Sequence, residues 1–292
     1  MMMESREQKM VFSFKCNVRP VEDNATFNIT EDGLRRLENK VAFITGGTSG
    51  IGKGTAYRLV EEGAKVIFTG RNEEAGHAIA KDIGAVFIKH DVQDAEGYTD
   101  IAKLIKSDFG RLDIAFANAG TEAGDSNIED IELSNWNDLI EINLTGAMLT
   151  SQMAVKLMRE NPNGATGSII LNSSMNAHIP MGNFVTYSTT KGAHIALGKS
   201  VAMHCANQGL KVRCNVIHPG VVETEMITKF IDGAPDSAAA RSQYEGLAPL
   251  KRMASVEEIA GLVAYLSSDE AAFISGASYN IDGATTSGMM GL

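Results

Sequence analysis

Eight residues with the sequence TGGTSGIG, residues 45–52, connect a short apolar run to a segment with helical periodicity. Side chains are missing at Gly46, Gly50 and Gly52, where the backbone has to turn sharply if a strand is to lead directly into a helix. The amide groups of such a turn and the positive end of the helix dipole form a site for a pyrophosphate, which Thr48, Ser49 and Ile51 would help to line. The alternative is a glycine-rich turn without a ligand. The order strand, turn, helix favours a dinucleotide site.

Short β-branched runs alternate with longer helical stretches from Lys40 onward. This alternation is typical of βαβ units and predicts a parallel sheet whose strands are buried on both faces. The expected strands are residues 41–45, 65–69, 85–89, 112–117, 168–172, 211–217 and 278–281, and the longest expected helical stretches are residues 135–160 and 187–207. The sequence thus predicts an α/β fold of the Rossmann type, a doubly wound parallel sheet of about seven strands with helices on both faces. Residues 37–292 are expected to form this single domain.

Composition argues against several classes of partner. The formal charge of −10 works against binding to a phosphate backbone, so no nucleic-acid partner is expected. No stretch is apolar enough to span a bilayer, and no membrane partner is expected. The three cysteines, Cys16, Cys205 and Cys214, have no C-x-x-C spacing, so we expect neither a disulfide framework nor a metal site. Unpaired cysteines favour a reducing compartment, the cytoplasm.

Residues 1–36 contain no apolar run of the kind that a secretory signal requires. We expect an N-terminal extension that is either mobile, packed on the surface, or an arm that reaches a neighbouring subunit. The residues themselves do not decide among these alternatives.

The end of the second expected strand reads VIFTGRN, residues 66–72. Gly70 stands where a carboxylate would accept hydrogen bonds from the ribose of NAD, about 20 residues after the glycine turn. The neighbouring Arg71 offers a guanidinium group that could pair with the 2′-phosphate of NADP. We therefore expect NADP(H) as the favoured cofactor. NAD(H) stays open, because Arg71 could be a solvated surface residue and the glycine turn holds no basic residue.

Two further segments are expected beside the cofactor. After the third strand, the Asp91 carboxylate could accept from an adenine amine while the Val92 backbone pairs with the ring, although Asp91 could equally cap the next helix. After the fourth strand, the small residues of ANAG, residues 117–120, would let Asn118, Ala119 and Gly120 pass close to the cofactor ribose.

Tyr187 and Lys191 lie four residues apart in the second long helical stretch, so they share one helix face and can act on one substrate atom. A free phenol has a pKa near 10, and we expect the Lys191 ammonium and the oxidised nicotinamide to lower the pKa of Tyr187. Ser173 or Ser174, at the end of the fifth strand, could donate a hydrogen bond to the substrate oxygen. Asn143 is expected to position a water that carries protons from Lys191 to solvent.

These motifs together resemble the short-chain dehydrogenase/reductase family over nearly the whole chain from residue 36 onward. The resemblance rests on residues 45–52, ANAG at 117–120, Asn143, Ser174, Tyr187 with Lys191, and HPGVVET at residues 218–224. It implies a catalytic tetrad of Asn143, Ser174, Tyr187 and Lys191. Ser174 is chosen over Ser173 because the family places its serine thirteen residues before the tyrosine.

The same resemblance implies further features of the chain. Pro219 and Gly220 would lie beside the cofactor, and the Val222 backbone and the Thr224 side chain would hold the nicotinamide carboxamide. A homotetramer is expected. Two positions depart from the family pattern, because Ala117 stands where many members have Asn, and Ala284 where a second Gly often follows Asp-Gly.

The substrate is expected to be a small carbonyl compound or alcohol, held under a mobile lid at residues 225–250. The side chains expected around it are mostly apolar and suggest an apolar or cyclic substrate: Met175, His178, Ile179, Met181, Phe184, Met226, Ile227 and Phe230. The chain looks similar to the branch that holds hydroxysteroid and cyclic-alcohol dehydrogenases. Reduction of a 3-oxoacyl thioester or a sugar is the alternative, and a non-catalytic dinucleotide-binding regulator is disfavoured because all four tetrad positions are filled.

Overall fold

Seven parallel strands form a central sheet in the order β5-β4-β3-β6-β7-β8-β9. The computed structural model describes residues 29–30 and 33–288. The strands of the sheet are β3 (Val41–Ile44), β4 (Lys65–Gly70), β5 (Val86–Lys89), β6 (Ile114–Ala117), β7 (Thr166–Asn172), β8 (Lys211–Pro219) and β9 (Ser278–Ile281). The short strands β1 (Ile29–Thr30) and β2 (Gly33–Leu34) pair with each other in an antiparallel arrangement.

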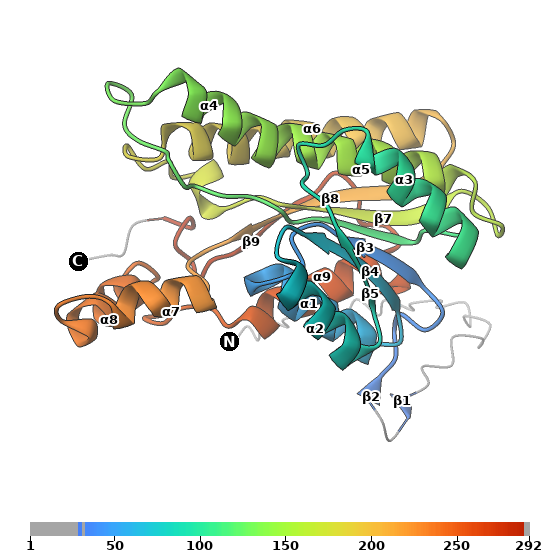
Figure 1. The fold of residues 1–292 in the computed structure, drawn as a ribbon, viewed down its shortest axis with the longest axis horizontal. Coiled ribbons are helices and arrows are strands. Elements are labelled where there is room, and N and C mark those ends of the chain that lie inside the picture. Colours follow the sequence, from blue (N-terminus) through green and yellow to red (C-terminus); the bar gives the residue numbers. More distant parts are fainter. Residues whose placement is uncertain (1–28, 31–32, 289–292) are drawn as a thin grey trace, which may run out of the picture.

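Helices cover both faces of the sheet (Figure 1). One face carries α1 (Gly50–Glu61), α2 (Glu73–Ile83) and α9 (Val256–Ser267), and the other carries α3 (Gly97–Leu104), α4 (Leu133–Ile140), α5 (Gly146–Arg159) and α6 (Val185–Asn207). The helices α7 (Glu225–Asp232) and α8 (Ser237–Gly246) follow β8 and lie at one end of the molecule (Figure 1). The fold is therefore the predicted Rossmann-type α/β arrangement in a single domain.

The direction in which strands are added reverses between β3 and β6. From β3 the chain adds β4 and β5 on one side, and it then returns to pair β6 with the other side of β3. In doubly wound sheets the crevice at such a switch point, outside the carboxyl ends of the strands, is where ligands bind. The segments that follow β3 and β6 are the glycine turn and residues 118–120. The topology thus brings these two motifs to one edge of the sheet.

Two hydrophobic clusters, one on each face of the sheet, form the core. Ile101, Met158 and Cys205 belong to the cluster under α3, α5 and α6, whereas Leu59 and Val263 belong to the cluster under α1 and α9. Every residue of β3 and β6 is buried, which explains their continuous apolar sequences.

All seven expected strands are present, with ends that differ by up to two residues, but three details of the prediction were wrong. The strands β5 and β9 are not buried on both faces, because each lies at an edge of the sheet and has one neighbouring strand. Val86 of β5, for example, is 37% exposed. The helical stretch expected at residues 135–160 is divided, because a turn of π-helix at Glu141–Thr145 separates α4 from α5. The stretch expected from residue 187 begins earlier, at Val185.

Residues 1–28, most of the expected N-terminal extension, lie outside the part of the chain that the structure describes. Within residues 29–30 and 33–288, no helix combines the length and the apolar character that crossing a membrane would require.

Candidate active site

The glycine turn has the backbone shape that a dinucleotide requires. Gly46 and Gly50 have φ angles of 67° and 51°, in the left-handed region that side chains disfavour. A Cβ added at Gly52 would lie 2.1 Å from the Gly46 carbonyl oxygen, so the turn closes only without a side chain there. Ser49 precedes α1 and its side chain does not cap the helix, which leaves the first-turn amides available to an anion. The turn therefore fits a pyrophosphate.

Residues 118–120 are fastened to this turn by hydrogen bonds. The Asn118 side-chain amide donates to the carbonyl oxygens of Thr45 and Gly46, each at 3.0 Å. The backbone N–H groups of Asn118 and Ala119 donate to the Thr45 hydroxyl. A Cβ at Gly46 would lie 2.9 Å from the Ala119 Cα, so the two segments touch. Their contact forms the floor of the crevice at the switch point.

Ser174, Tyr187 and Lys191 come together above this floor. Ser174 follows β7, and its hydroxyl lies near enough to the Tyr187 phenol to lower the pKa of the phenol. Lys191 Nζ lies 5.4 Å from the centre of the Tyr187 ring and donates to the Asn172 carbonyl oxygen at 2.7 Å. The other candidate serine, Ser173, is buried and donates its hydroxyl hydrogen to the Lys191 carbonyl oxygen at 2.7 Å. Ser174 is therefore the serine that faces the phenol.

Asn143 and Lys191 both border Gly120. A Cβ at Gly120 would lie 3.1 Å from Asn143 Oδ1 and 3.2 Å from Lys191 Nζ. The Asn143 side chain binds both backbone groups of Thr121, accepting from its N–H at 2.8 Å and donating to its carbonyl oxygen at 2.8 Å. Its second amide hydrogen reaches the Thr190 hydroxyl at 3.3 Å. A water at this side chain would have to use the remaining lone pair of Oδ1, which lies beside Gly120.

Burial shifts the pKa values of both titratable groups. Removal from water raises the pKa of Tyr187 to about 12, while the hydrogen bond from Ser174 lowers it and the charge of Glu122 raises it. Burial lowers the pKa of Lys191 to about 8, against the opposing effect of Glu122. The expectation of a lowered phenol pKa is therefore wrong for the chain by itself, because desolvation outweighs the other influences. Two cations were expected to lower the pKa of Tyr187, namely Lys191 and the oxidised nicotinamide. The nicotinamide is not part of the chain, so its effect would come in addition to those described.

The position predicted to select the ribose is shaped by Gly70 and Thr48. A Cβ at Gly70 would lie 2.5 Å from Thr48 Cγ2 and 2.8 Å from Thr48 Oγ1, so the threonine side chain occupies the space that a carboxylate would need. Arg71 lies next to it with 73% of its side chain exposed, and its Nη1 is 4.0 Å from Asp91 Oδ2. An exposed guanidinium is a group that can bind a phosphate.

The helix-capping alternative for Asp91 is wrong. Asp94 binds the amides at the start of α3, since its Oδ1 accepts from Glu96 and Gly97 N–H, each at 3.1 Å. Asp91 instead accepts from the Gln93 N–H at 3.1 Å. The neighbouring Val92 is buried, and its side chain packs against Gly146 at the start of α5. A role for either residue at an adenine ring stays a prediction.

The segment after β8 brings its expected residues to the same edge of the sheet. Thr224 Cγ2 would lie 3.4 Å from a Cβ at Gly50, which places the threonine beside the glycine turn. Val222 is buried and forms a parallel bridge with Ala254. Pro219 ends β8, and Gly220 approaches Asp282 so closely that a Cβ would be 2.8 Å from its Cα.

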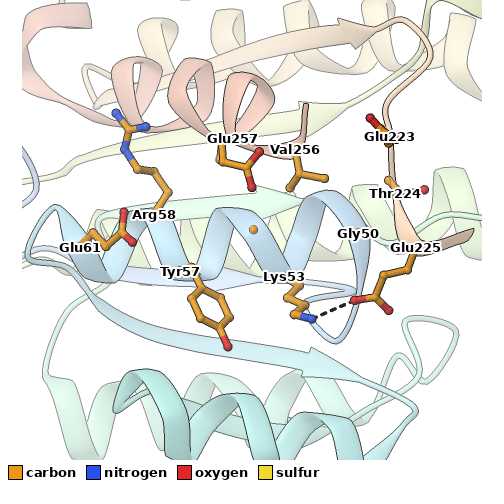
Figure 2. Close-up of a pocket in the computed structure, with 12 residues that line it drawn as sticks. Gly50, Lys53, Tyr57, Arg58, Glu61, Glu223, Thr224, Glu225, Val256 and Glu257 are labelled. Atoms are coloured by element: carbon orange, nitrogen blue, oxygen red, sulfur yellow. Dashed lines mark hydrogen bonds and ion pairs between the residues drawn. The ribbon is translucent and has the colours of Figure 1, made fainter. Parts of the chain in front are cut away.

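A cavity of about 390 Å³ lies on the outer side of α1, between α1, α9 and residues 223–225 (Figure 2). Gly50 and Thr224 belong to its lining, but the four residues of the predicted tetrad do not. Charged side chains of both signs surround it, and Lys53 and Glu225 form an ion pair of 2.9 Å across one end. This cavity is therefore adjacent to the crevice and separate from the cluster around Tyr187.

The apolar side chains expected around a substrate are partly open to solvent. Ile179 and Met181 are each 40% exposed, and Met226 and Phe230 of α7 are 48% and 61% exposed. A pocket closed by residues 225–250 therefore stays a prediction. Within the described part of the chain, no three His, Cys, Asp or Glu residues are grouped as metal ligands.

Two residues near the tetrad were not predicted. His194 is buried, and its Nε2 lies 2.8 Å from the Asn143 carbonyl oxygen, while its Nδ1 has no hydrogen-bond partner among the described residues. Burial, more than the charge of Lys191, lowers the pKa of His194 to about 3. The Asp125 carboxylate binds the start of α6. His194 lies one helical turn beyond Lys191, which is the only sequence signal that could have drawn attention to it.

Comparisons with known proteins agree with this geometry. Residues 46–286 match the protein family described as Enoyl-(Acyl carrier protein) reductase. An NADP-dependent (R)-specific alcohol dehydrogenase of Lentilactobacillus kefiri is 34% identical over 255 residues, covering 86% of this chain and 98% of that protein. A 3-beta-hydroxysteroid dehydrogenase of Comamonas testosteroni is 32% identical, covering 85% and 96%. The 3-oxoacyl-[acyl-carrier-protein] reductase FabG of Escherichia coli is also 32% identical, covering 85% and 97%.

Proposed function

This chain belongs to the short-chain dehydrogenase/reductase family of NAD(P)-dependent oxidoreductases, and from that premise we propose that it interconverts a ketone and a secondary alcohol. The proposal rests above all on one observation, the proximity of the Ser174 hydroxyl, the Tyr187 phenol and the Lys191 ammonium. They meet at the sheet edge where the glycine turn opens α1. An acid/base group, a hydrogen-bond donor and a cation beside a dinucleotide site are the groups that carbonyl reduction requires.

In this proposal each side chain has one task. The nicotinamide, when bound, supplies or accepts the hydride. Tyr187 gives its phenol proton to the substrate oxygen during reduction and takes it back during oxidation. Ser174 donates a hydrogen bond to the same oxygen and holds the substrate in place. With a pKa of about 8, Lys191 is mostly protonated at pH 7, so its positive charge favours the phenolate. Asn143 holds residues 120–121 beside Lys191 and offers Oδ1 to a water that exchanges protons with the lysine.

We propose NADP(H) as the favoured cofactor. Gly70 offers no carboxylate to the ribose, the Thr48 side chain fills the space beside Gly70, and the exposed Arg71 guanidinium follows directly in the chain. The relative from L. kefiri, whose name states NADP dependence, agrees with this choice. In the proposed site, Asp91 and Val92 lie at the adenine, while Val222 and Thr224 hold the carboxamide.

For the substrate we propose an apolar or cyclic ketone or alcohol. The exposed side chains of Ile179, Met181, Met226 and Phe230 would bury apolar surface against such a molecule as residues 225–250 close over it. The similarity to a hydroxysteroid dehydrogenase supports this choice. A 3-oxoacyl thioester is the second candidate, supported by the similarity to FabG.

The proposal also includes a homotetramer in the cytoplasm. Cys205 and Cys214 are both buried free thiols, which suits a reducing compartment. Light scattering of the purified chain tests the assembly state.

The proposed function is tested with a panel of cyclic ketones, hydroxysteroids and 3-oxoacyl thioesters, each assayed with NADPH and NADH. The variant Tyr187→Phe should bind NADPH with unchanged affinity and lose turnover by at least ~100-fold, because the acid that protonates the substrate oxygen in the proposed mechanism is gone. Tyr265→Phe, on α9, is the control for loss of a phenol hydroxyl and should keep its rate. Turnover near the wild-type rate in Tyr187→Phe would rule out the proposed mechanism.

A further inference from the structure

The helix that carries Tyr187 and Lys191 has no cap from its own preceding residue. Phe184 stands at the N-cap position of α6 and offers no side-chain acceptor to the first-turn amides. Unpaired amides at a helix start are costly when they are away from water, so a partner has to come from elsewhere.

The loop after β6 supplies that partner. Asp125 Oδ1 accepts from the Thr186 N–H at 3.1 Å, and Asp125 Oδ2 accepts from the Tyr187 N–H at 2.7 Å. The Ser126 carbonyl oxygen accepts from the Val185 N–H at 3.2 Å. Three consecutive amides of α6, including that of Tyr187 itself, are therefore held by two neighbouring loop residues. The carboxylate also lies at the positive end of the helix dipole, where a negative charge is favourable.

The other end of this loop is fastened to Asn143. Thr121 exchanges two hydrogen bonds of 2.8 Å with the Asn143 side chain, and its hydroxyl accepts from the Ala123 N–H at 3.1 Å. The Asp125 N–H donates to the Glu122 carbonyl oxygen at 3.0 Å, which folds the segment between the two anchors into a turn. Residues 121–126 thus form a short bridge from Asn143, between α4 and α5, to the first turn of α6.

We propose that Asp125 is a positioning residue, whose carboxylate fixes the Tyr187 backbone relative to Asn143 and so sets the place of the phenol above the crevice. The inference rests on the proposed function, because that function makes Tyr187 the proton donor and the inference explains how Tyr187 is held in place. It goes beyond an ordinary helix cap. A cap on a remote helix would contribute stability alone, whereas this carboxylate binds the amide of the residue that bears the reacting phenol.

The test compares Asp125→Ala, Asp125→Asn and a control that loses the cap of a helix other than α6. Ser255→Ala removes the hydroxyl that caps α9, where Ser255 Oγ accepts from the Glu258 N–H at 3.3 Å. For each variant, kcat and KM are measured with the best substrate of the panel, together with the NADPH dissociation constant and the hydrogen-exchange rate of the Tyr187 amide. The free energy of unfolding is measured alongside.

In Asp125→Ala we expect kcat to fall about tenfold, because a displaced reacting group costs rate without removing substrate contacts. KM and the NADPH dissociation constant should stay within about twofold of the wild type. The Tyr187 amide should exchange faster. Asp125→Asn, whose amide oxygen can still accept, should recover kcat to within about threefold of the wild type. Ser255→Ala should lose stability and keep its kcat.

An Asp125→Ala variant that loses stability but keeps its kcat would overturn the inference, as would unchanged exchange at the Tyr187 amide. The exchange measurement separates this inference from the proposed function. If the wild-type chain reduces no member of the panel, the proposed function fails, while faster exchange in Asp125→Ala still supports the link from Asp125 to Tyr187.

Discussion

Lys191 Nζ lies 5.4 Å from the centre of the Tyr187 ring, one turn farther along the same helix, and binds the Asn172 carbonyl oxygen at the end of β7. Helix and strand thus hold the ammonium group between them, with only 3% of the lysine exposed. Removing an ammonium ion from water costs free energy, which appears as the depressed pKa of Lys191. A cation held at this cost beside a phenol is consistent with a catalytic site, where stability is often given up for function.

The depressed pKa predicts how stability depends on pH. The pKa of Lys191 is about 8 in the folded chain and 10.5 in the unfolded reference. Between these values the unfolded chain binds a proton that the folded chain has released, so the contribution of Lys191 to the free energy of unfolding rises with pH. Relative to Lys191→Met, the wild type should gain about 2 kcal/mol between pH 8 and pH 10, measured by urea unfolding at both values. Tyr187 is present in both the wild type and Lys191→Met, so its own titration cancels in this comparison.

Lys103→Met serves as the control for this comparison. Lys103 is 73% exposed and pairs with Asp100, so this variant controls for the loss of a lysine outside the buried cluster. If the free energies of unfolding of Lys191→Met and the wild type changed in parallel between pH 8 and pH 10, the pKa of Lys191 would not be lowered in the folded chain.

The proposed cofactor preference predicts a selective effect of Arg71→Ala. Loss of the guanidinium should weaken NADPH binding about tenfold, because a charge-assisted contact to the 2′-phosphate disappears. NADH has no phosphate there, and its affinity should change by less than about twofold. Fluorescence titration of both cofactors gives the two dissociation constants. Equal losses for NADPH and NADH would remove Arg71 from the phosphate site.

Because the Thr48 side chain lies against Gly70, we predict that the preference for NADPH over NADH can be reversed only by two substitutions together. Gly70→Asp alone should weaken both cofactors, because its Cβ would come within 2.8 Å of two Thr48 side-chain atoms and displace them. Combining it with Thr48→Ala should restore NADH binding and favour NADH over NADPH by about tenfold, since a carboxylate can now accept from the ribose hydroxyl and repel the phosphate. Thr48→Ala alone is the control. A single Gly70→Asp variant that already binds NADH tightly would show that Thr48 is no obstacle.

The sheet, the glycine turn and the Tyr-Lys pair could be predicted from the sequence because each depends on neighbouring residues. The strands are short apolar runs, and Tyr187 and Lys191 share a helix face by spacing alone. The position of Ala284 was also informative, since the family often has glycine there and Ala284 has a φ angle of 71°. Such features depend on residues that are close together in the sequence, so they can be predicted without knowledge of the tertiary contacts.

The supporting contacts could not be predicted, because their partners are far apart in the chain. Asp125 binds an amide 62 residues away, and His194 binds a carbonyl 51 residues away. The direction of the Tyr187 pKa shift was missed for a related reason, since desolvation depends on what surrounds the phenol and not on its helical neighbour. The π-turn at Glu141–Thr145 likewise has no distinctive composition within a long helical pattern.

His194 gives the last prediction, because it is the buried partner of the Asn143 carbonyl. A neutral imidazole carries one N–H, and the hydrogen bond of 2.8 Å requires it on Nε2. His194→Leu leaves that carbonyl without a donor and should lower the free energy of unfolding by about 2 kcal/mol at pH 7, whereas Gln at the same position can still donate.

The imidazole pKa of His194 is 6.5 in the unfolded chain and about 3 in the folded chain, so between these values the unfolded chain alone binds the proton. As pH falls from 6.5 to 5, the wild type should therefore lose about 2 kcal/mol relative to His194→Gln, measured by urea unfolding. His218 titrates in both chains and cancels. Parallel stability curves would mean that the pKa of His194 is not lowered in the folded chain.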